Sequence, residues 1–533
     1  MSASYLDRAR LKRSIQVSLI PPEWRLESIP SVDAVPDAEA YIRSSSNKLL
    51  TPQELAITEI SDVNILLGKL ARRELSSLEV TKAFAKRAAL LHQLTTCCTE
   101  IFFEDAFARA KLLDDHLQRT GRTVGPLHGL PVSIKDLFGV EGVDTCIAMT
   151  LRRLGAVLYV KTNVPQSMMM SDSYNHVFGQ CVSSLNRNFI SGGSSGGESS
   201  LVSGKGSILG IGTDIGGSIR IPANLCGLYG LSPSTGRQPY ERNGPRQDII
   251  RSVAGPMSRN LATVEKYMEA LPAAKPWEID PHVTPIPWRT ELCTTTKRLK
   301  IGYIIDDGVV KVQPPVARAV REVVDALKAA GHEVVEWDAS THSHAYDIWE
   351  KAILADGGQG CQRLCDLSGE PLIEGMLVGK PENLLTTAQT HQLNSDKYAY
   401  EIDYLRRWTA SKLDAIIMPI TPWVSYQPGT WVKSHQYVGY TSIWNLVDYP
   451  SLAIPVTKAD KQKDGRGSQD WRDHRPRNKS DEFNHKQFDI DLVHGMPVGV
   501  QIVTPKLQEE KCIAVAKVVE QSLRLANAAS SRL

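Results

Sequence analysis

The sequence lacks any long run of apolar residues and any strong net charge. Its longest apolar stretches, such as AVLYV at 156–160, fall far short of the roughly 20 residues of a membrane-spanning helix. The N-terminal stretch MSASYLDRARLKRSIQ contains no apolar run of the signal-peptide type. The net charge is only +2 over 533 residues, so nothing in it requires a nucleic-acid or acidic partner. We therefore expect a cytoplasmic protein with no membrane and no nucleic-acid partner.

Cysteines at paired or metal-binding spacing are also missing. The nine cysteines, an odd number, stand at 97, 98, 146, 181, 226, 293, 361, 365 and 512. The adjacent pair Cys97 and Cys98 and the i, i+4 pair Cys361 and Cys365 have no two further ligands at zinc-like spacing. A disulfide framework is not expected in so large a chain. We interpret the cysteines as free thiols in a reducing compartment and expect no metal and no organic cofactor.

Short apolar segments that alternate with helical patterns are present, and this alternation is typical of an α/β protein. Capping boxes at Thr51/Glu54 and Ser76/Glu79 predict two helix starts, and 314–331 predicts a helix with Pro near its start and Gly just past its end. The predicted strands are 130–134, 156–160, 300–304, 333–337, 414–420 and 497–503.

Two segments differ in composition from this body. Residues 1–50 are polar and dotted with prolines, so we expect an N-terminal arm that lies on the main domain of 51–533. Residues 458–487 carry many charges of both signs and no Leu, Ile or Val. This composition predicts a solvated, mobile surface loop.

Residues 192–220 read GGSSGGESSLVSGKGSILGIGTDIGGSIR, of which ten are glycine and seven serine. A flexible linker would lack buried-type residues, but this run contains LV and ILGI. A phosphate loop fails because Gly206 follows Lys205, and a dinucleotide fingerprint fails because position 209 is Leu. Two overlapping G-x-S-x-G matches carry little weight, because no clear strand precedes them.

One interpretation remains for this run. Ser194 and Ser218 each follow a Gly-Gly pair, and Lys135 ends a predicted buried strand in GPLHGLPVSIKD, 125–136. Glycines before a serine allow close approach of a substrate, and consecutive backbone amides can bind an oxyanion.

These residues resemble the amidase signature family, through GPLHGLPVSIKD, GGSSGGE and GTDIGGSIRIPANLCGLYGL. Further similarity runs from IPPEWRLE to GMPVGVQIV, and PWR, LDAIIMPITP and NLVDYPSLAIPVT are closest to fungal acetamidase-type general amidases. The resemblance implies an α/β fold of one large domain, with a central mixed, twisted sheet covered by helices on both faces and a signature core at about 125–260.

The resemblance also implies a Ser-cisSer-Lys triad. In this chain Ser218 would attack the amide carbonyl, and Ser194, after a cis peptide, would relay a proton to Lys135. The amides of Ile215, Gly216, Gly217 and Ser218 would form the oxyanion hole. Ser195, Asp214 and Arg220 would support the loop that carries the catalytic serines without contacting the substrate. The implied substrate is a small-molecule amide, with a homodimer possible.

Lys135 must lose its proton to act as a base. A free lysine has a pKa of about 10.4, so the side chain must be desolvated, which a place at the end of the apolar strand VSI favours. Alternation along that strand predicts that Asp136 faces away from it. Met168, Met169 and Met170 are candidates for the acyl pocket or for ordinary core packing.

Two departures from the family pattern affect the site. The chain passes from Thr145 to Leu151 through CIAMT alone, where family members carry several more helical turns. We expect this loss to uncover apolar surface or to reshape the entrance. In addition, Ser183-Ser184 replaces an Asn-Pro before the glycine-serine run, which predicts a looser loop.

The leading hypothesis is an amide hydrolase that releases carboxylate and ammonia through an acyl-enzyme. Its alternatives are a catalytically impaired scaffold protein, suggested by the shortened segment at 145–151, and the amidase subunit of a tRNA-dependent amidotransferase. A lipid-amide hydrolase is a further alternative, although the N-terminal arm shows no membrane-binding helix pattern.

Overall fold

An eleven-stranded sheet runs through the computed structural model, which describes residues 4–139, 145–241, 247–434, 436–465 and 467–530. The strand order is β1-β3-β2-β6-β8-β7-β12-β13-β11-β9-β10, and β4 and β5 form a separate hairpin. The strands are β1 Cys98–Ile101, β2 Pro131–Lys135, β3 Val157–Thr162, β4 Tyr174–Asn175, β5 Gly179–Gln180, β6 Leu209–Asp214, β7 Tyr229–Ser232, β8 Val253–Ser258, β9 Lys300–Tyr303, β10 Glu333–Glu336, β11 Ala415–Met418, β12 Ser451–Lys458 and β13 Pro497–Val503.

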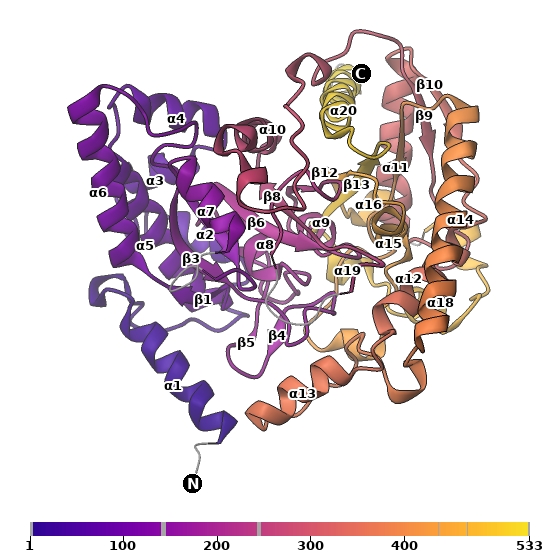
Figure 1. The fold of residues 1–533 in the computed structure, drawn as a ribbon, viewed down its shortest axis with the longest axis horizontal. Helices are drawn as coiled ribbons and strands as arrows, with labels where there is room; N and C mark the ends of the chain where they lie inside the picture. The colour runs from indigo at the N-terminus through magenta and orange to yellow at the C-terminus, as the bar shows by residue number, and fades with distance from the viewer. Residues whose placement is uncertain (1–3, 140–144, 242–246, 435, 466, 531–533) are drawn as a thin grey trace.

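Helices flank this sheet (Figure 1). They are α1 Tyr5–Ser18, α2 Ala38–Arg43, α3 Pro52–Glu59, α4 Val63–Ala71, α5 Ser77–Thr95, α6 Phe103–Thr120, α7 Cys146–Arg153, α8 Gly196–Ser203, α9 Arg220–Leu225, α10 Leu261–Ala270, α11 Pro314–Ala329, α12 His342–Leu354, α13 Gln359–Ser368, α14 Thr387–Ser411, α15 Gly439–Leu446, α16 Lys461–Asp464, α17 Gln469–Arg472, α18 Lys479–Lys486, α19 Ile490–Val493 and α20 Glu509–Ser530. The predicted α/β class is confirmed.

The sheet is mixed, as expected. The pairs β2–β3, β2–β6, β9–β10 and β9–β11 are parallel, and the other neighbours are antiparallel. All six predicted strands are present with ends within two residues of the prediction, and both predicted capping boxes form. Because β2, β3 and β6 are parallel neighbours, Lys135, Thr162 and Asp214 all lie at the same edge of the sheet.

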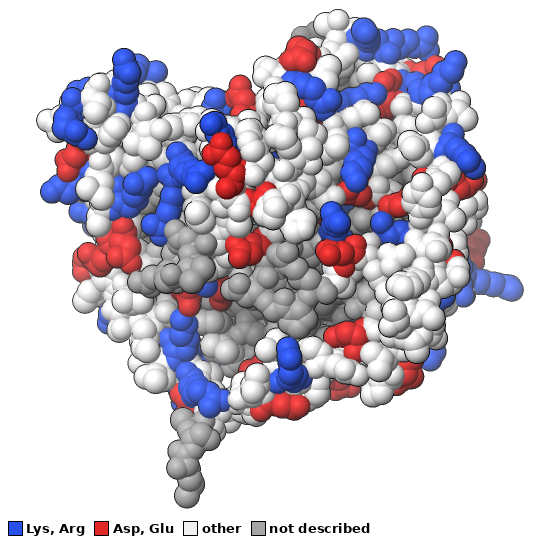
Figure 2. Space-filling model, in the orientation of Figure 1, with Lys and Arg blue, Asp and Glu red and all other residues white. Residues whose placement is uncertain are grey.

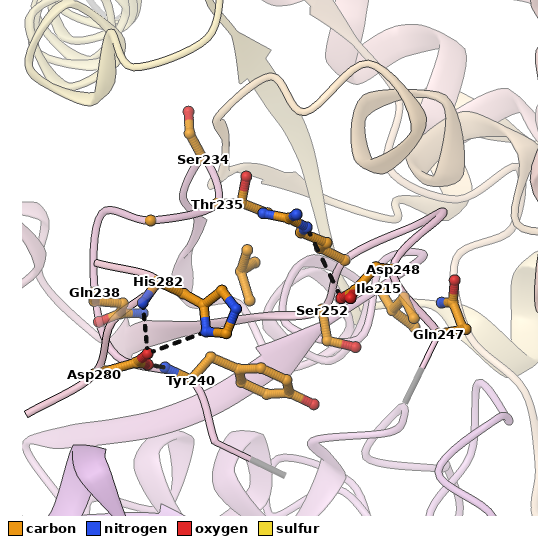
Figure 3. Close-up of a pocket in the computed structure, with 13 residues that line it drawn as sticks. Ile215, Ser234, Thr235, Gln238, Tyr240, Gln247, Asp248, Ser252, Asp280 and His282 are labelled. Atoms are coloured by element: carbon orange, nitrogen blue, oxygen red, sulfur yellow. Dashed lines mark hydrogen bonds and ion pairs between the residues drawn. The ribbon is translucent and has the colours of Figure 1, made fainter. Parts of the chain in front are cut away.

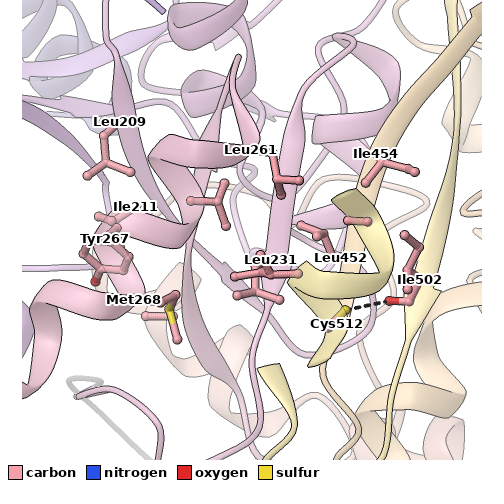
Figure 4. Close-up of a cluster of buried hydrophobic side chains, with 14 of the residues drawn as sticks. Leu209, Ile211, Leu231, Leu261, Tyr267, Met268, Leu452, Ile454, Ile502 and Cys512 are labelled. Carbon is pink, nitrogen blue, oxygen red and sulfur yellow. Dashed lines mark hydrogen bonds between the residues drawn. The ribbon is translucent and has the colours of Figure 1, made fainter. Parts of the chain in front are cut away.

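Buried hydrophobic side chains from several strands and helices form the core around this sheet (Figure 4). Leu209 and Ile211 of β6, Leu452 of β12 and Ile502 of β13 are each at most 1% exposed. Helix α20 is fixed to the sheet by Cys512, whose Sγ donates a hydrogen bond to the Ile502 carbonyl at 3.2 Å. Each fully buried aliphatic side chain of this kind stabilises the fold by about 1.5–3 kcal/mol.

Residues 4–50 lie against the body of the protein. Lys12 pairs with Glu100 at 2.7 Å, and the Gln16 side chain accepts a hydrogen bond from the Ile101 amide at 2.7 Å. Farther along, the Ala38 amide donates to the Ser184 carbonyl at 3.0 Å. These contacts tie helices α1 and α2 to strand β1 and to the stretch before the glycine-serine run.

The segment 458–487 differs from the predicted surface loop. It contains the short helices α16, α17 and α18 and buries Trp471 and Asp481. The Asp481 carboxylate accepts hydrogen bonds from the Lys311 amide at 2.9 Å and from His474 at 2.8 Å. The segment is mostly exposed, as expected of a surface loop, but it contains short helices, and the buried side chains of Trp471, Asp464 and Asp481 anchor it although it has no Leu, Ile or Val.

Charges of both signs are interspersed over the described residues of the face in Figure 2, which shows no large area of a single sign. Within the same described ranges, no helix is long and apolar enough to cross a membrane.

Candidate active site

Lys135 and Ser194 meet at the edge of the sheet where the parallel strands end. Lys135 is the last residue of β2, and Ser194 stands two residues before helix α8. The Lys135 Nζ atom lies 2.7 Å from Ser194 Oγ and 2.7 Å from Thr213 Oγ1. The peptide bond between Gly193 and Ser194 is cis. The structure thus brings together two of the three expected triad residues.

Burial changes the chemistry of Lys135. The side chain is fully buried, and desolvation lowers its pKa to about 7, against the opposing charges of Asp214 and Glu198. The next residue, Asp136, pairs with Lys161 at 2.7 Å, so its carboxylate faces away from Lys135 as predicted. The lysine can therefore be neutral near pH 7 and accept a proton.

Ser218 lies in the loop between β6 and α9 and is partly exposed. The Ser195 amide donates to the Ser218 carbonyl at 3.2 Å, which links the loops that carry the two serines. Among the described residues no hydrogen bond joins the Ser194 and Ser218 hydroxyls. Ser195 fixes its loop to the end of β6. Its Oγ donates to the Thr213 carbonyl at 3.3 Å and accepts from the Thr213 amide at 3.2 Å.

Two side chains orient the peptides before Ser218. Trp349 of α12 donates its indole N–H to the Ile215 carbonyl at 2.9 Å, and Thr441 of α15 donates its hydroxyl to the Gly216 carbonyl. In a trans peptide the following N–H points opposite to the carbonyl, so the Trp349 contact directs the Gly216 amide away from the indole. A Cβ at Gly216 would lie 2.4 Å from the Trp349 ring, so only glycine fits there.

The Gly217 amide departs from the expected oxyanion hole. It donates to Asp214 Oδ1 at 2.8 Å, because the Gly216 carbonyl is turned toward Thr441 and the Gly217 N–H must point the other way. In the described residues no partner is recorded for the amides of Ile215, Gly216 and Ser218. Three of the four expected amides are thus available to an oxyanion.

Asp214 and Arg220 form a fully buried ion pair behind the loop. Arg220 Nη2 lies 2.9 Å from Asp214 Oδ1, and attraction to this guanidinium holds the pKa of Asp214 below its usual value despite burial. Arg220 also donates to the Gln501 side chain at 2.9 Å and to Asn445 at 2.7 Å. The pair therefore connects the loop that carries Ser218 to α15 and β13.

An apolar pocket of about 340 Å³, part of it open to solvent, borders Ser218. Its lining includes Met168, Met169, Met170, Ile221, Trp349, Leu377 and Val438. The alternative that placed the three methionines at an acyl pocket is thus the one that the geometry favours. The space in it that water-sized groups can occupy is only about 30 Å³, so the pocket has room for a short group beside Ser218.

A second pocket, with a more polar lining, shares Ile215 with the apolar pocket (Figure 3). Asp280 is buried there and accepts hydrogen bonds from the amides of Tyr240 at 3.0 Å and His282 at 2.9 Å. Gln238 and Ser234 belong to the same lining.

Comparisons with known proteins agree with this geometry. The model of the family described as Amidase matches residues 79–513. The chain belongs to the amidase family. Its relatives include an acetamidase of Emericella nidulans, 36% identical over 98% of this chain and 99% of that protein, and Amidase 1 of Gibberella moniliformis, 36% identical over 89% and 95%. A solved fatty acid amide hydrolase superposes with a TM-score of 0.89 at 33% identity, covering 97% of this chain and 95% of the other.

The described residues of this amidase are packed against the rest of the protein at both places where the sequence departs from the family pattern. Val143 and Asp144 lie outside the described residues, but from Cys146 a short helix, α7, fills the shortened connection and buries Ile147 and Leu151. The Cys146 amide donates to Glu241 at 3.1 Å, beside the polar pocket. Within α7, Met149 presents a large apolar side chain to solvent and is 37% exposed.

Ser183 and Ser184, which replace the usual Asn-Pro, are both fully buried. The Ser184 hydroxyl lies 2.7 Å from that of Ser203 in α8, and the Ser184 carbonyl accepts the Ala38 amide. The expected loosening of the loop is absent from this structure.

Several residues of the amidase site were missed by the sequence reasoning. They are Thr213, Glu198, Trp349, Thr441, Asn445 and Gln501. Thr213 and Glu198 lie within the glycine-serine run, but the others come from segments more than 120 residues away. No local pattern marks such contacts. Within the described ranges, no group of three or more His, Cys, Asp or Glu side chains could hold a metal ion.

Proposed function

We propose that this amidase cleaves its substrate through an acyl-enzyme on Ser218, with Ser194 as proton relay and Lys135 as base. The observation that carries the proposal is the 2.7 Å contact between the buried Lys135 amine and Ser194 Oγ. A lysine whose pKa is near 7 is suited to accept a proton at neutral pH.

In the proposed reaction the Ser218 oxygen attacks the amide carbonyl while its proton passes through Ser194 to Lys135. The amides of Ile215, Gly216 and Ser218 stabilise the resulting oxyanion. Return of the proton to the nitrogen expels ammonia and leaves an ester on Ser218. Water, deprotonated along the same route, then hydrolyses the ester to the carboxylate. A Ser218 rotamer that reaches Ser194 is required for the first step.

We further propose short aliphatic amides as substrates. The small apolar pocket beside Ser218 supports this choice, as does the similarity to a protein named acetamidase. The nine cysteines, all described and all free, fit a cytoplasmic location.

The decisive experiment is Ser218→Ala, assayed for ammonia release from acetamide and for labelling by a fluorophosphonate. Both signals should vanish. Ser425→Ala is the matched control, because this buried hydroxyl has no partner among the described residues. A Ser218→Ala variant that turns over acetamide at the parent rate would refute the nucleophile. No labelling of folded parent protein would favour the scaffold alternative.

A second experiment measures kcat/KM on linear amides from acetamide to octanamide. A short pocket predicts a fall of about tenfold or more once the acyl chain exceeds its length. A rate that rises steadily with chain length would contradict the proposed substrate class.

A further inference from the structure

Glu198 is a fully buried acidic residue that the proposed reaction does not use. It lies in α8, four residues after Ser194, and its carboxyl group is enclosed by three neighbouring strands. Its Oε1 atom lies 2.9 Å from the Thr162 hydroxyl of β3, and its Oε2 atom lies 2.6 Å from the Ser133 hydroxyl of β2. A Cβ at Gly210 of β6 would come within 2.1 Å of Glu198 Oε2.

The contact between Glu198 and Ser133 begins a chain of three oxygen–oxygen contacts that ends at the Leu209 carbonyl. Ser133 Oγ lies 2.9 Å from Ser207 Oγ, and Ser207 Oγ lies 2.9 Å from the Leu209 carbonyl oxygen. A carbonyl oxygen only accepts hydrogen bonds, so Ser207 must donate its single hydrogen to Leu209. Ser133 must then donate its own hydrogen to Ser207, because Ser207 has no other to give. The third contact, between Ser133 and Glu198, is left without a hydroxyl hydrogen.

A protonated carboxyl group of Glu198 supplies this hydrogen and makes all three short contacts hydrogen bonds. We propose that Glu198 is a neutral carboxylic acid that donates to Ser133, accepts from Thr162, and thereby acts as a positioning residue for Lys135. Ser133 stands two residues before Lys135 on the same strand, and Glu198 follows Ser194 in the chain. One side chain thus holds the strand of the base against the helix that begins beside the relay serine. This inference concerns the reaction proposed above and rests on it for its role in catalysis.

The surroundings agree with a neutral acid. The ionisable groups that face Glu198 are Lys135 on β2, Cys98 on β1 and Tyr159 on β3. Burial raises the pKa of Glu198 to about 8, although the hydrogen bond that Thr162 donates and the charge of Lys135 act the other way. A negative charge here would raise the pKa of Lys135, so a neutral Glu198 helps to keep the base unprotonated.

The direct test is infrared spectroscopy of the folded protein at pH 6.5, comparing the parent with Glu198→Gln. The parent should show an additional C=O band of a protonated carboxylic acid. An additional carboxylate band in its place would overturn the proposal. If Glu198→Gln does not fold, Ser133→Ala replaces it, and this variant must shift the carboxylic-acid band. A shift of a carboxylate band would also overturn the proposal. These measurements need no turnover, so they stay decisive even if Ser218→Ala refutes the nucleophile.

The positioning role is tested by kinetics. Glu198→Gln keeps a neutral group with one donor and one acceptor, so kcat/KM should stay within about threefold of the parent with an unchanged acid limb in its pH profile. Glu198→Ala should lower kcat by about 100-fold with little change in KM, because the base is no longer held in place. An acid limb displaced by a full unit in Glu198→Gln, or a loss equal to that of Glu198→Ala, would contradict the assignment.

Discussion

Two segments of this amidase have compositions typical of unstructured chain, and they fold in different ways. Residues 192–220 are rich in Gly and Ser, and nearly all of them are buried, with their polar groups bonded to one another. Residues 458–487 are rich in charge and mostly exposed, with only a few buried anchors such as Trp471 and Asp481. Low hydrophobicity therefore does not exclude an ordered structure where buried polar groups are paired. The comparison predicts that substitutions in the first segment and its partners affect catalysis and those in the second do not.

The largest expected effect is on turnover. Lys135→Ala removes the proposed base, and kcat should fall by about 10⁴-fold or more, as for other residues that act as a catalytic unit. Ammonia release from acetamide measures it. Lys311→Ala, a change at the contact of the 458–487 segment, should retain parent activity. Equal losses in the two variants would break the comparison.

Arg220→Met should give the largest loss of stability. It leaves the buried Asp214 carboxylate without its partner, and the expected decrease in the free energy of unfolding is about 3–5 kcal/mol. Urea unfolding measures it. Arg318→Met is the matched control, since this arginine pairs with Asp464 in the second segment at 2.7 Å with its side chain 15% exposed. A control loss as large as that of Arg220→Met would refute the distinction between the segments.

Trp471→Ala tests the anchor of the second segment. Removal of this ring, 6% exposed, should destabilise the protein by about 3 kcal/mol and leave kcat/KM unchanged. Thermal unfolding and the acetamide assay measure the two quantities. A fall in kcat/KM parallel to the loss of stability would show that the segment supports the site.

The pH dependence of turnover should follow Lys135. Burial lowers the pKa of this lysine to about 7, and the base acts only when it is neutral. The value of kcat/KM should therefore decrease about tenfold per unit as the pH falls below 7, and level off above it. A profile that stays flat down to pH 5 would exclude Lys135 as the titrating group. Trp471→Ala should have the profile of the parent.

The smallest effect is expected from exposed charges of the second segment. Lys486 pairs with Glu482 across one helical turn, and its side chain is 72% exposed. Lys486→Ala should change the free energy of unfolding by less than about 0.5 kcal/mol. Urea unfolding at low and high salt measures it, and a loss above 1 kcal/mol would place this pair among the structural anchors.

Local signals in the sequence predicted much of the fold. Capping boxes and apolar segments are recognisable because each depends on residues a few positions apart. The contact between Lys135 and Ser194 followed from resemblance to a family and not from spacing, since 59 residues separate the two. The anchors Trp471 and Asp481 were overlooked, because their partners, such as the Lys311 amide, lie in another part of the chain. The occupied amide of Gly217 depends on Thr441, which is equally remote in sequence.

The contacts of Arg220 have a consequence for how the enzyme matures. Its guanidinium reaches Asn445 and Gln501, which leave the ribosome more than 200 residues after Arg220 itself. A nascent or truncated chain that ends before β13 contains Ser218, Ser194 and Lys135 but lacks the Gln501 contact of Arg220. We therefore expect fragments that end before β13 to have less amidase activity than the whole chain.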